Sequence, residues 1–301
     1  WMRVGEVQGV RGEVGTEAGY GDQSVATWSV DVPRGGEVDV EYCVDLSGED
    51  GTVPSGIWSD HGLVLSRSLF VFPVAWIADM RTPLDGHISV EVSSPQDWAV
   101  YAPWTMDETG VFRPESLEDL LDSAIALGNY RGYVLQDDAF RVRLLMPPTA
   151  DVRLSERRVG ELGRGILSVY RFFGFAPESM DKNLLAVFVD AGHGFPSADP
   201  TAVALSGHQL LVSTDDTLPP CLRETTLGAA FSLWDGAALR TTPPWADAVP
   251  NPAAWLEAGA TDYFVQRMLV DSGTMSPVHY WNNVRAMVRD MDEASSSLAD
   301  A

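Results

Sequence analysis

The first third of the chain alternates apolar and polar residues in three short runs, Ser24–Val32, Glu37–Asp45 and His87–Val92. A period of two residues is typical of β-strands with one buried and one solvated face. Clusters of glycine, proline and aspartate, such as Ser47–Gly56, separate these runs, as turns and loops do. The pattern predicts an N-terminal β-sandwich-like domain over residues 1–115.

The pattern becomes helical at Ser116. Ser116 followed by Asp119 resembles a capping box and predicts a helix that ends near Gly128. A longer helix is expected over about 154–173. Two strands should follow, a buried one at Leu184–Val189 and another at His208–Ser213.

Prolines near a first helical turn mark three further helices. These are expected from Pro220 to Trp234, from Asn251 to about Gly273, and from Ser276 to a tail that frays after Asp292. Strands followed by helices predict an α+β second domain over residues 116–301.

Composition and net charge limit the kinds of molecule that the chain can bind. The chain has 301 residues, 45% of them hydrophobic, which is ample for buried cores. Its formal charge of −23 repels phosphate backbones and anionic lipid, so we expect neither a nucleic-acid nor a membrane partner. Two cysteines, Cys43 and Cys221, exclude a disulfide scaffold but leave one bridge open. No signal peptide is visible, and the chain starts abruptly at Trp1, so the compartment stays open between the cytoplasm and export after loss of a leader.

Four segments have the order and spacing of one known family: Ser116–Gly128, Tyr170–Pro177, Phe231–Gly236 and Trp255–Phe264. The third resembles the tail of an HExxHxWN motif, and the fourth resembles a WfsEGfTdYy segment. The chain is thereby similar to the M61 (glycyl aminopeptidase-like) gluzincin peptidases, without a match to their C-terminal PDZ domain. The resemblance implies that the second domain is a thermolysin-like α+β domain.

The same resemblance places the zinc site on residues that do not bind zinc. The two histidines fall on Gly228 and Ser232, the glutamate base on Ala229 and the third ligand on Ala258. A site of this class needs two imidazoles at i and i+4 and a carboxylate from a later helix. We therefore expect no zinc peptidase activity, no metal and no cofactor.

The family's substrate-anchoring GGLEH strand falls on residues 193–197, where Pro196 takes the place of the glutamate. Loss of the anchor and of the large zinc ligands predicts a wider, less polar pocket. The residues expected to line it are Gly228, Ala229, Ser232, Ala258, Tyr263, His193 and His208.

Asp262 is the main candidate for a new catalytic role. It lies four residues after Ala258, where a thermolysin-like site has an aspartate that orients the first histidine. We expect a buried carboxylate that either acts as a general acid or base or pairs with Arg240 or Arg267. Glu224, one turn before the first ligand position, is either a second candidate or a solvated acid of the first helical turn.

Three functions remain open. The first is a pocket that binds a small molecule or peptide without turnover. The second is a metal-independent enzyme that uses Asp262 for proton transfer, cyclisation, elimination or isomerisation. The third is a structural or interaction module with a collapsed cleft.

Overall fold

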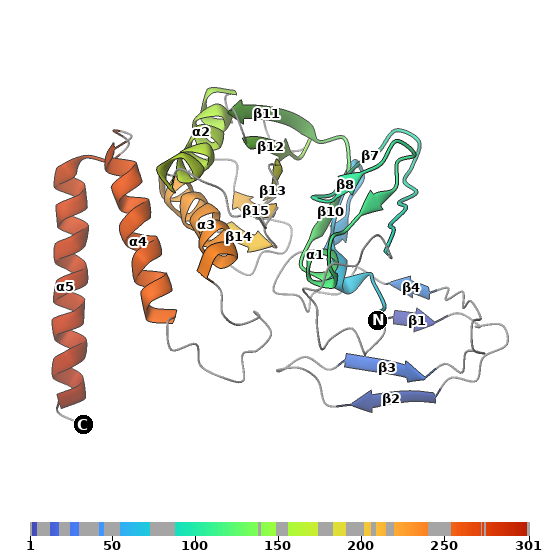
Figure 1. The fold of residues 1–301 in the computed structure, drawn as a ribbon, viewed down its shortest axis with the longest axis horizontal. Helices are drawn as coiled ribbons and strands as arrows, with labels where there is room; N and C mark the ends of the chain where they lie inside the picture. The colour runs from blue at the N-terminus through green and yellow to red at the C-terminus, as the bar shows by residue number, and fades with distance from the viewer. Residues whose placement is uncertain are drawn as a thin grey trace.

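The structure is a computed structural model with a mixed α/β fold (Figure 1). It describes residues 2–4, 13–17, 25–29, 42–44, 55–72, 88–137, 140–148, 156–173, 183–190, 202–205, 209–214, 220–239, 254–271, 273 and 275–299.

Short antiparallel ladders make up the early part of the chain. They are β1 (Met2–Val4) with β4 (Tyr42–Val44), β2 (Glu13–Glu17) with β3 (Val25–Ser29), and β8 (Thr105–Met106) with β9 (Phe112–Arg113). Strands β3 and β4 lie within two of the predicted runs. The third prediction, 87–92, is wrong for its described residues, because only Val90 is paired there, in an isolated bridge to Phe112.

A four-stranded antiparallel sheet follows, in the order β5-β6-β10-β7. Its strands are β5 (Gly56–Ile57), β6 (His61–Leu65), β7 (Ala99–Tyr101) and β10 (Ala124–Gly128). A 3-10 turn, η1 (Ser66–Ser68), follows β6.

The helix predicted from Ser116 is shorter than expected. Its cap is present, because the Ser116 hydroxyl accepts a hydrogen bond from the Asp119 N–H at 3.0 Å. Helix α1 covers only Leu117–Leu121, and residues 124–128 form strand β10 instead. Neighbouring residues of β10 are buried on opposite faces of the sheet, Ala124 in one apolar cluster and Ile125 in another. This two-sided burial favours a strand over a helix.

The second sheet has five strands in the order β11-β12-β13-β15-β14. Strands β12, β13 and β15 run parallel, and β11 and β14 pair antiparallel at the edges. Strands β13 (Asn183–Asp190) and β15 (Gln209–Thr214) confirm the predicted ones. Strands β11 (Arg131–Asp137), β12 (Phe140–Met146) and β14 (Ala202–Leu205) were not predicted.

Four long helices complete the fold: α2 (Glu156–Phe173), α3 (Pro220–Leu239), α4 (Ala254–Asp271) and α5 (Pro277–Ala299). Helix α3 continues past Trp234, and α5 continues past Asp292, so both predicted ends were too early. Ser276 caps α5 as predicted, because its hydroxyl accepts the His279 N–H at 3.1 Å. None of the described helices combines the length and apolar character needed to span a bilayer.

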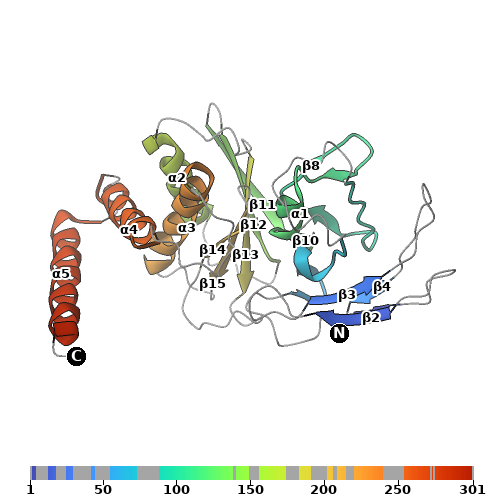
Figure 2. The same ribbon diagram turned by 60° about the horizontal axis from the view of Figure 1, so that its bottom comes forward.

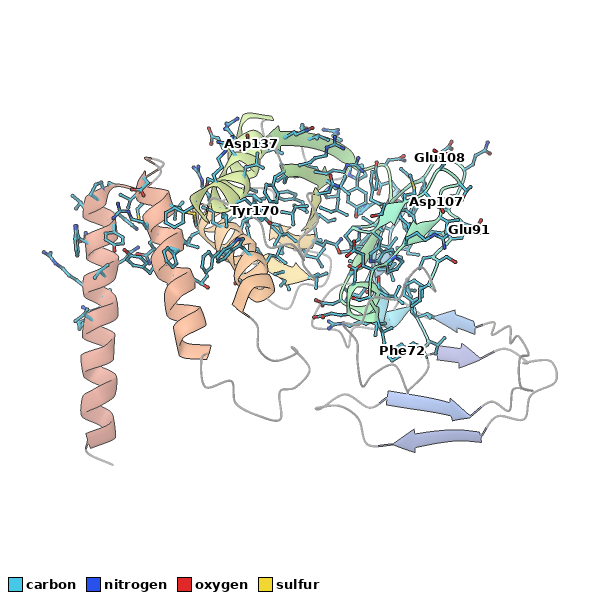
Figure 3. The ribbon with its side chains drawn as sticks, in the orientation of Figure 1. Phe72, Glu91, Asp107, Glu108, Asp137 and Tyr170 are labelled. Carbon is cyan, nitrogen blue, oxygen red and sulfur yellow. The ribbon has the colours of Figure 1, made fainter. Side chains whose placement is uncertain are left out.

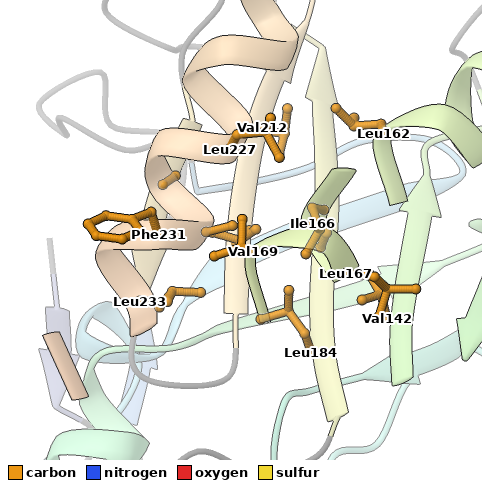
Figure 4. Packing of buried hydrophobic residues seen from close by; sticks show 14 of the residues in the cluster. Val142, Leu162, Ile166, Leu167, Val169, Leu184, Val212, Leu227, Phe231 and Leu233 are labelled. Carbon is orange, nitrogen blue, oxygen red and sulfur yellow. The ribbon is translucent and has the colours of Figure 1, made fainter. Parts of the chain in front are cut away.

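These elements stack in layers (Figures 1 and 2). One face of the five-stranded sheet packs on α2 and α3 through residues such as Val142, Leu184 and Val212 (Figure 4). Its other face, with Leu145 and Val187, packs on the four-stranded sheet. Helix α1 and the β8–β9 hairpin cover the far side of that sheet. The boundary at 115/116 stays a prediction, although α1 and β10 share their cores with strands that precede them.

One side chain joins the two sheets by hydrogen bonds. Gln209 of β15 is fully buried, and its amide oxygen accepts the Ala124 N–H of β10 at 2.7 Å. Its amide nitrogen donates to the Ala124 carbonyl at 2.9 Å. The Gln209 side chain thus pairs with both the N–H and the carbonyl of Ala124. Strand β7 does not reach these groups, because it pairs with residues 126–128 of β10.

Candidate functional site

Helices α3 and α4 pack against each other where the resemblance places the zinc site. Phe231 of α3 stacks on Phe264 of α4, with the ring centroids 5.6 Å apart. A methyl group added at Gly228 would lie 3.9 Å from Cγ2 of Thr261. Gly228 therefore faces α4 directly, at the distance of an ordinary van der Waals contact.

The positions that correspond to the zinc ligands lie on these two helices. Gly228 and Ser232 are one turn apart on α3, on the same face, and both are half-buried. Ala229 beside them is buried in the main core. Ala258 precedes Thr261 by three residues on α4, so it lies on the helix face that meets Gly228. The packing of α3 against α4 places Gly228 opposite Thr261. That positions 228, 232 and 258 line one cleft stays a prediction.

Asp262 is exposed, so the expectation that its carboxylate is buried is wrong. It lies on the same face of α4 as Ala258, four residues later, and solvent therefore reaches this face. Arg267, one of its two expected partners, instead donates to Asp271 at 3.1 Å, and this hydrogen bond raises the pKa of Arg267. The other expected partner, Arg240, lies outside the described residues.

The remaining candidates are distributed around the cleft. Glu224 is half-buried one turn before Gly228 on α3, and its proposed role stays a prediction. Tyr263 is 50% exposed, and its ring meets Phe264 edge-to-face at 5.3 Å. His193 and His208 lie outside the described residues.

The edge of the five-stranded sheet also borders α3. Strand β14 is the last strand in the sheet order, is antiparallel to β15 and packs against α3. Its residues, Ala202–Leu205, carry no carboxylate. The strand predicted at 193–197 lies outside the described residues. Among the described strands, none pairs with the outer edge of β14, and an edge strand of this kind can pair with an extended peptide.

A second concave site lies between α2 and α3, and sequence reasoning missed it. Its volume is about 220 Å³, and none of the predicted pocket residues lines it. The lining residues are Glu161, Arg164, Gly165 and Ser168 of α2 with Arg223 and Leu227 of α3. The available signal was the unusual glycine content of the predicted helix over 154–173, which indicates a close approach by a neighbour.

Structural comparisons connect this arrangement to zinc peptidases. An aminopeptidase N family protein from Idiomarina loihiensis matches with a TM-score of 0.66 at 14% identity, over 93% of this chain and 47% of its own. An M1 zinc metallopeptidase from Deinococcus radiodurans matches with a TM-score of 0.50 at 16% identity, over 98% and 65% of the two chains. A variant of that enzyme gives 0.51 at 17% identity, with the same coverage.

These likenesses show the fold, which is gluzincin-like. The chain spans about half the length of the first structure and about two thirds of the second. No family profile and no curated protein matches the sequence. The solved relatives are M1 rather than M61 peptidases, so the assignment to M61 stays a prediction.

At the positions that the resemblance assigns to the zinc ligands, the side chains of α3 do not fit that metal. Gly228 and Ala229 offer no donor atom, and the Ser232 hydroxyl is a poor ligand in place of an imidazole. Within the described ranges, no group of three or more histidine, cysteine, aspartate or glutamate side chains could hold a metal ion.

Proposed function

We propose that this protein is a non-peptidolytic relative of the gluzincin peptidases, and that its α3–α4 cleft binds a small molecule or a peptide. The observation that supports the proposal is the facing pair of helices with Gly228 opposite Thr261, which is the packing expected of a zinc-site scaffold without its ligands. Zinc-bound water cannot be held or activated by a glycine, an alanine and a serine.

The exposure of the cleft supports binding over collapse. Asp262 of α4 is exposed, and Gly228 and Ser232 of α3 are half-buried. The neighbouring edge strand β14 supports a ligand with an extended backbone, because an edge strand offers unpaired N–H and C=O groups.

The alternative of a metal-independent enzyme depended on a buried Asp262 carboxylate. Its exposure removes the desolvated environment that tunes an acid or base. A metal-independent turnover that Asp262→Asn abolishes would restore this alternative.

Substituting zinc-ligand residues at positions 228, 232 and 258 tests whether α3 and α4 have the arrangement of a gluzincin zinc site. The wild type, purified without chelator, should contain far less than one zinc per chain by mass spectrometry of the metal. The variant Gly228→His/Ser232→His/Ala258→Glu should bind about one zinc per chain, because its three ligands meet at one cleft. A matched control, Gly228→His/Ser232→His/Gly259→Glu, turns the carboxylate about 100° around α4 and should bind zinc weakly.

Two results would contradict the proposal. Stoichiometric zinc in the wild type at this cleft would contradict the loss of the metal site. A folded triple variant with no more zinc than its control would contradict the inherited helix arrangement.

Ligand binding is tested separately with a fragment library and short peptides in ligand-observed NMR. Hits of the wild type should disappear in Ser232→Phe, which fills the cleft, and should persist in a variant on another face such as Arg171→Met. Hits that Ser232→Phe leaves unchanged would place binding elsewhere.

A further inference from the structure

The pocket between α2 and α3 is separate from the α3–α4 cleft. Its α3 residues, Arg223 and Leu227, are one turn apart and face α2. Gly228 follows Leu227 and points about 100° away, toward α4. Figure 1 shows α2 and α3 side by side, with α4 next to them.

Arg223 has an unsatisfied donor in this pocket. Its side chain is half-buried, and its Nε atom is buried without a hydrogen-bond partner among the described residues. Buried N–H groups are nearly always paired, and an unpaired one points to a missing acceptor such as water or an ion. For a charged guanidinium the most favourable acceptor is an anion.

Two glycines of α2 make room for guanidinium groups. A methyl group at Gly165 would lie 4.0 Å from the Arg223 Nε and only 3.1 Å from Cδ2 of Leu227. At Gly160, the three nearest atoms to an added methyl group outside the helix backbone belong to the Arg164 guanidinium, the nearest at 3.4 Å. Glycine inside a helix is destabilising, so these positions favour space for the two guanidinium groups over helix stability.

The other polar groups that line the pocket are Ser168 and Glu161. Ser168 donates its hydroxyl hydrogen to the Gly165 carbonyl at 2.6 Å, which leaves its lone pairs as acceptors for a ligand N–H or O–H. Glu161 lines the pocket but has an interaction partner of its own. The volume of about 220 Å³ is below that of pockets that enclose a whole drug-sized ligand.

We propose that this pocket binds a carboxylate or phosphate group through Arg223 and Arg164, either as a small free anion or as the end group of a larger molecule. The planar guanidinium fork matches both groups in a bidentate geometry. In a chain of net charge −23, such a site needs a local concentration of positive charge, and the two arginines supply it.

The test is a titration of the whole chain in buffer without phosphate or carboxylate, followed by NMR or calorimetry. The probes are inorganic phosphate, acetate, and the peptide Ala-Ala-Phe with a free or an amidated carboxyl terminus. We expect saturable binding of at least one anionic probe at millimolar or lower concentration. Tighter binding of phosphate identifies a phosphate ligand, and binding of the free but not the amidated peptide identifies a peptide carboxylate.

Variants separate the pocket from general charge effects. Arg223→Met should weaken binding at least about tenfold, and Arg223→Lys should weaken it less because the charge remains. Arg171→Met is the matched control, because Arg171 lies on α2, pairs with Asp137 and does not line the pocket. Arg164→Met gives an independent readout, with circular dichroism as the check of folding.

The proposal is overturned if no anionic probe binds saturably, or if Arg223→Met and Arg171→Met bind equally well. The outcome is independent of the cleft, because Ser232→Phe should leave the affinity for anions unchanged.

Discussion

Gln209 offers the sharpest test of how the two sheets are joined. Its amide forms two hydrogen bonds with the backbone of Ala124, at 2.7 and 2.9 Å, and both residues are fully buried. The neighbouring Ser123 carbonyl accepts the Ser66 N–H at 2.9 Å, so the backbone of Ala124 faces away from β6. Gln209→Leu keeps a similar volume and removes both partners of Ala124.

The expected loss of stability follows from these two groups. Each buried backbone group left without a partner costs about 1–3 kcal/mol, which gives about 2–6 kcal/mol in total. Leucine has no polar group to desolvate, which offsets about 1–2 kcal/mol. We therefore expect a decrease of about 1–4 kcal/mol in the free energy of unfolding, a substantial part of the 5–15 kcal/mol typical of a domain.

Urea denaturation followed by circular dichroism measures this change. Gln136→Leu is the matched control, because Gln136 is exposed on β11 and its side-chain amide oxygen accepts a hydrogen bond from the exposed Arg141 at 3.3 Å. The control should change stability by less than about 0.5 kcal/mol.

Gln209→Glu adds a pH-dependent test. An ionised carboxylate can accept the Ala124 N–H but repels the Ala124 carbonyl, whereas the protonated acid restores a donor. Burial raises the pKa of this introduced carboxyl above its unfolded value of about 4.3, so the folded state binds the proton more tightly. Stability of this variant should therefore rise as pH falls from 7 toward 5.

The reasoning is refuted if Gln209→Leu is as stable as Gln136→Leu. It is also refuted if Gln209→Glu shows the same pH dependence as the wild type over that range.

Three further predictions concern single positions. Gly228→Ala should stabilise the protein by up to about 1 kcal/mol, since its methyl group meets one atom at 3.9 Å. Gly163→Ala should be about 1–3 kcal/mol less stable than Gly228→Ala, since its methyl group would lie 2.6 Å from a leucine methyl group, and thermal denaturation of the two variants compares them. Tyr170→Phe should be neutral or stabilising by about 1 kcal/mol, because the buried hydroxyl between α2 and the sheet (Figure 3) has no partner among the described residues; a clear loss of stability argues against it. Asp107 should titrate with a pKa of about 2 in NMR, because hydrogen bonds from the Thr109 hydroxyl and the Val111 N–H hold its pKa below 3.8. The ionised carboxylate therefore stabilises the β8–β9 turn above pH 4, this stabilisation is lost toward pH 2, and Asp107→Ala should lack the pH dependence.

The sequence by itself determined the elements whose signal is local. The long helix α2 and the buried strands β13 and β15 follow from apolar periodicity, and Ser276 caps α5 through its own hydroxyl. The identities of Gly228, Ala229 and Ser232, which the resemblance places at the zinc site and which are not zinc ligands, are likewise a property of the sequence. Each of these depends on residues within one or two turns or on one strand, so no distant part of the chain is needed.

Tertiary structure decided which residues are buried and which meet. The apolar run at 124–128 suits either a helix or a strand, and it became β10 because both faces of that strand are covered by other elements. Asp262 is exposed and Gln209 is buried, although both are polar residues in apolar surroundings of the sequence. The approach of Arg223 of α3 to Gly165 of α2 joins residues 58 positions apart in the sequence. Burial and contact of this kind depend on how distant segments pack, and local periodicity carries no information about that packing.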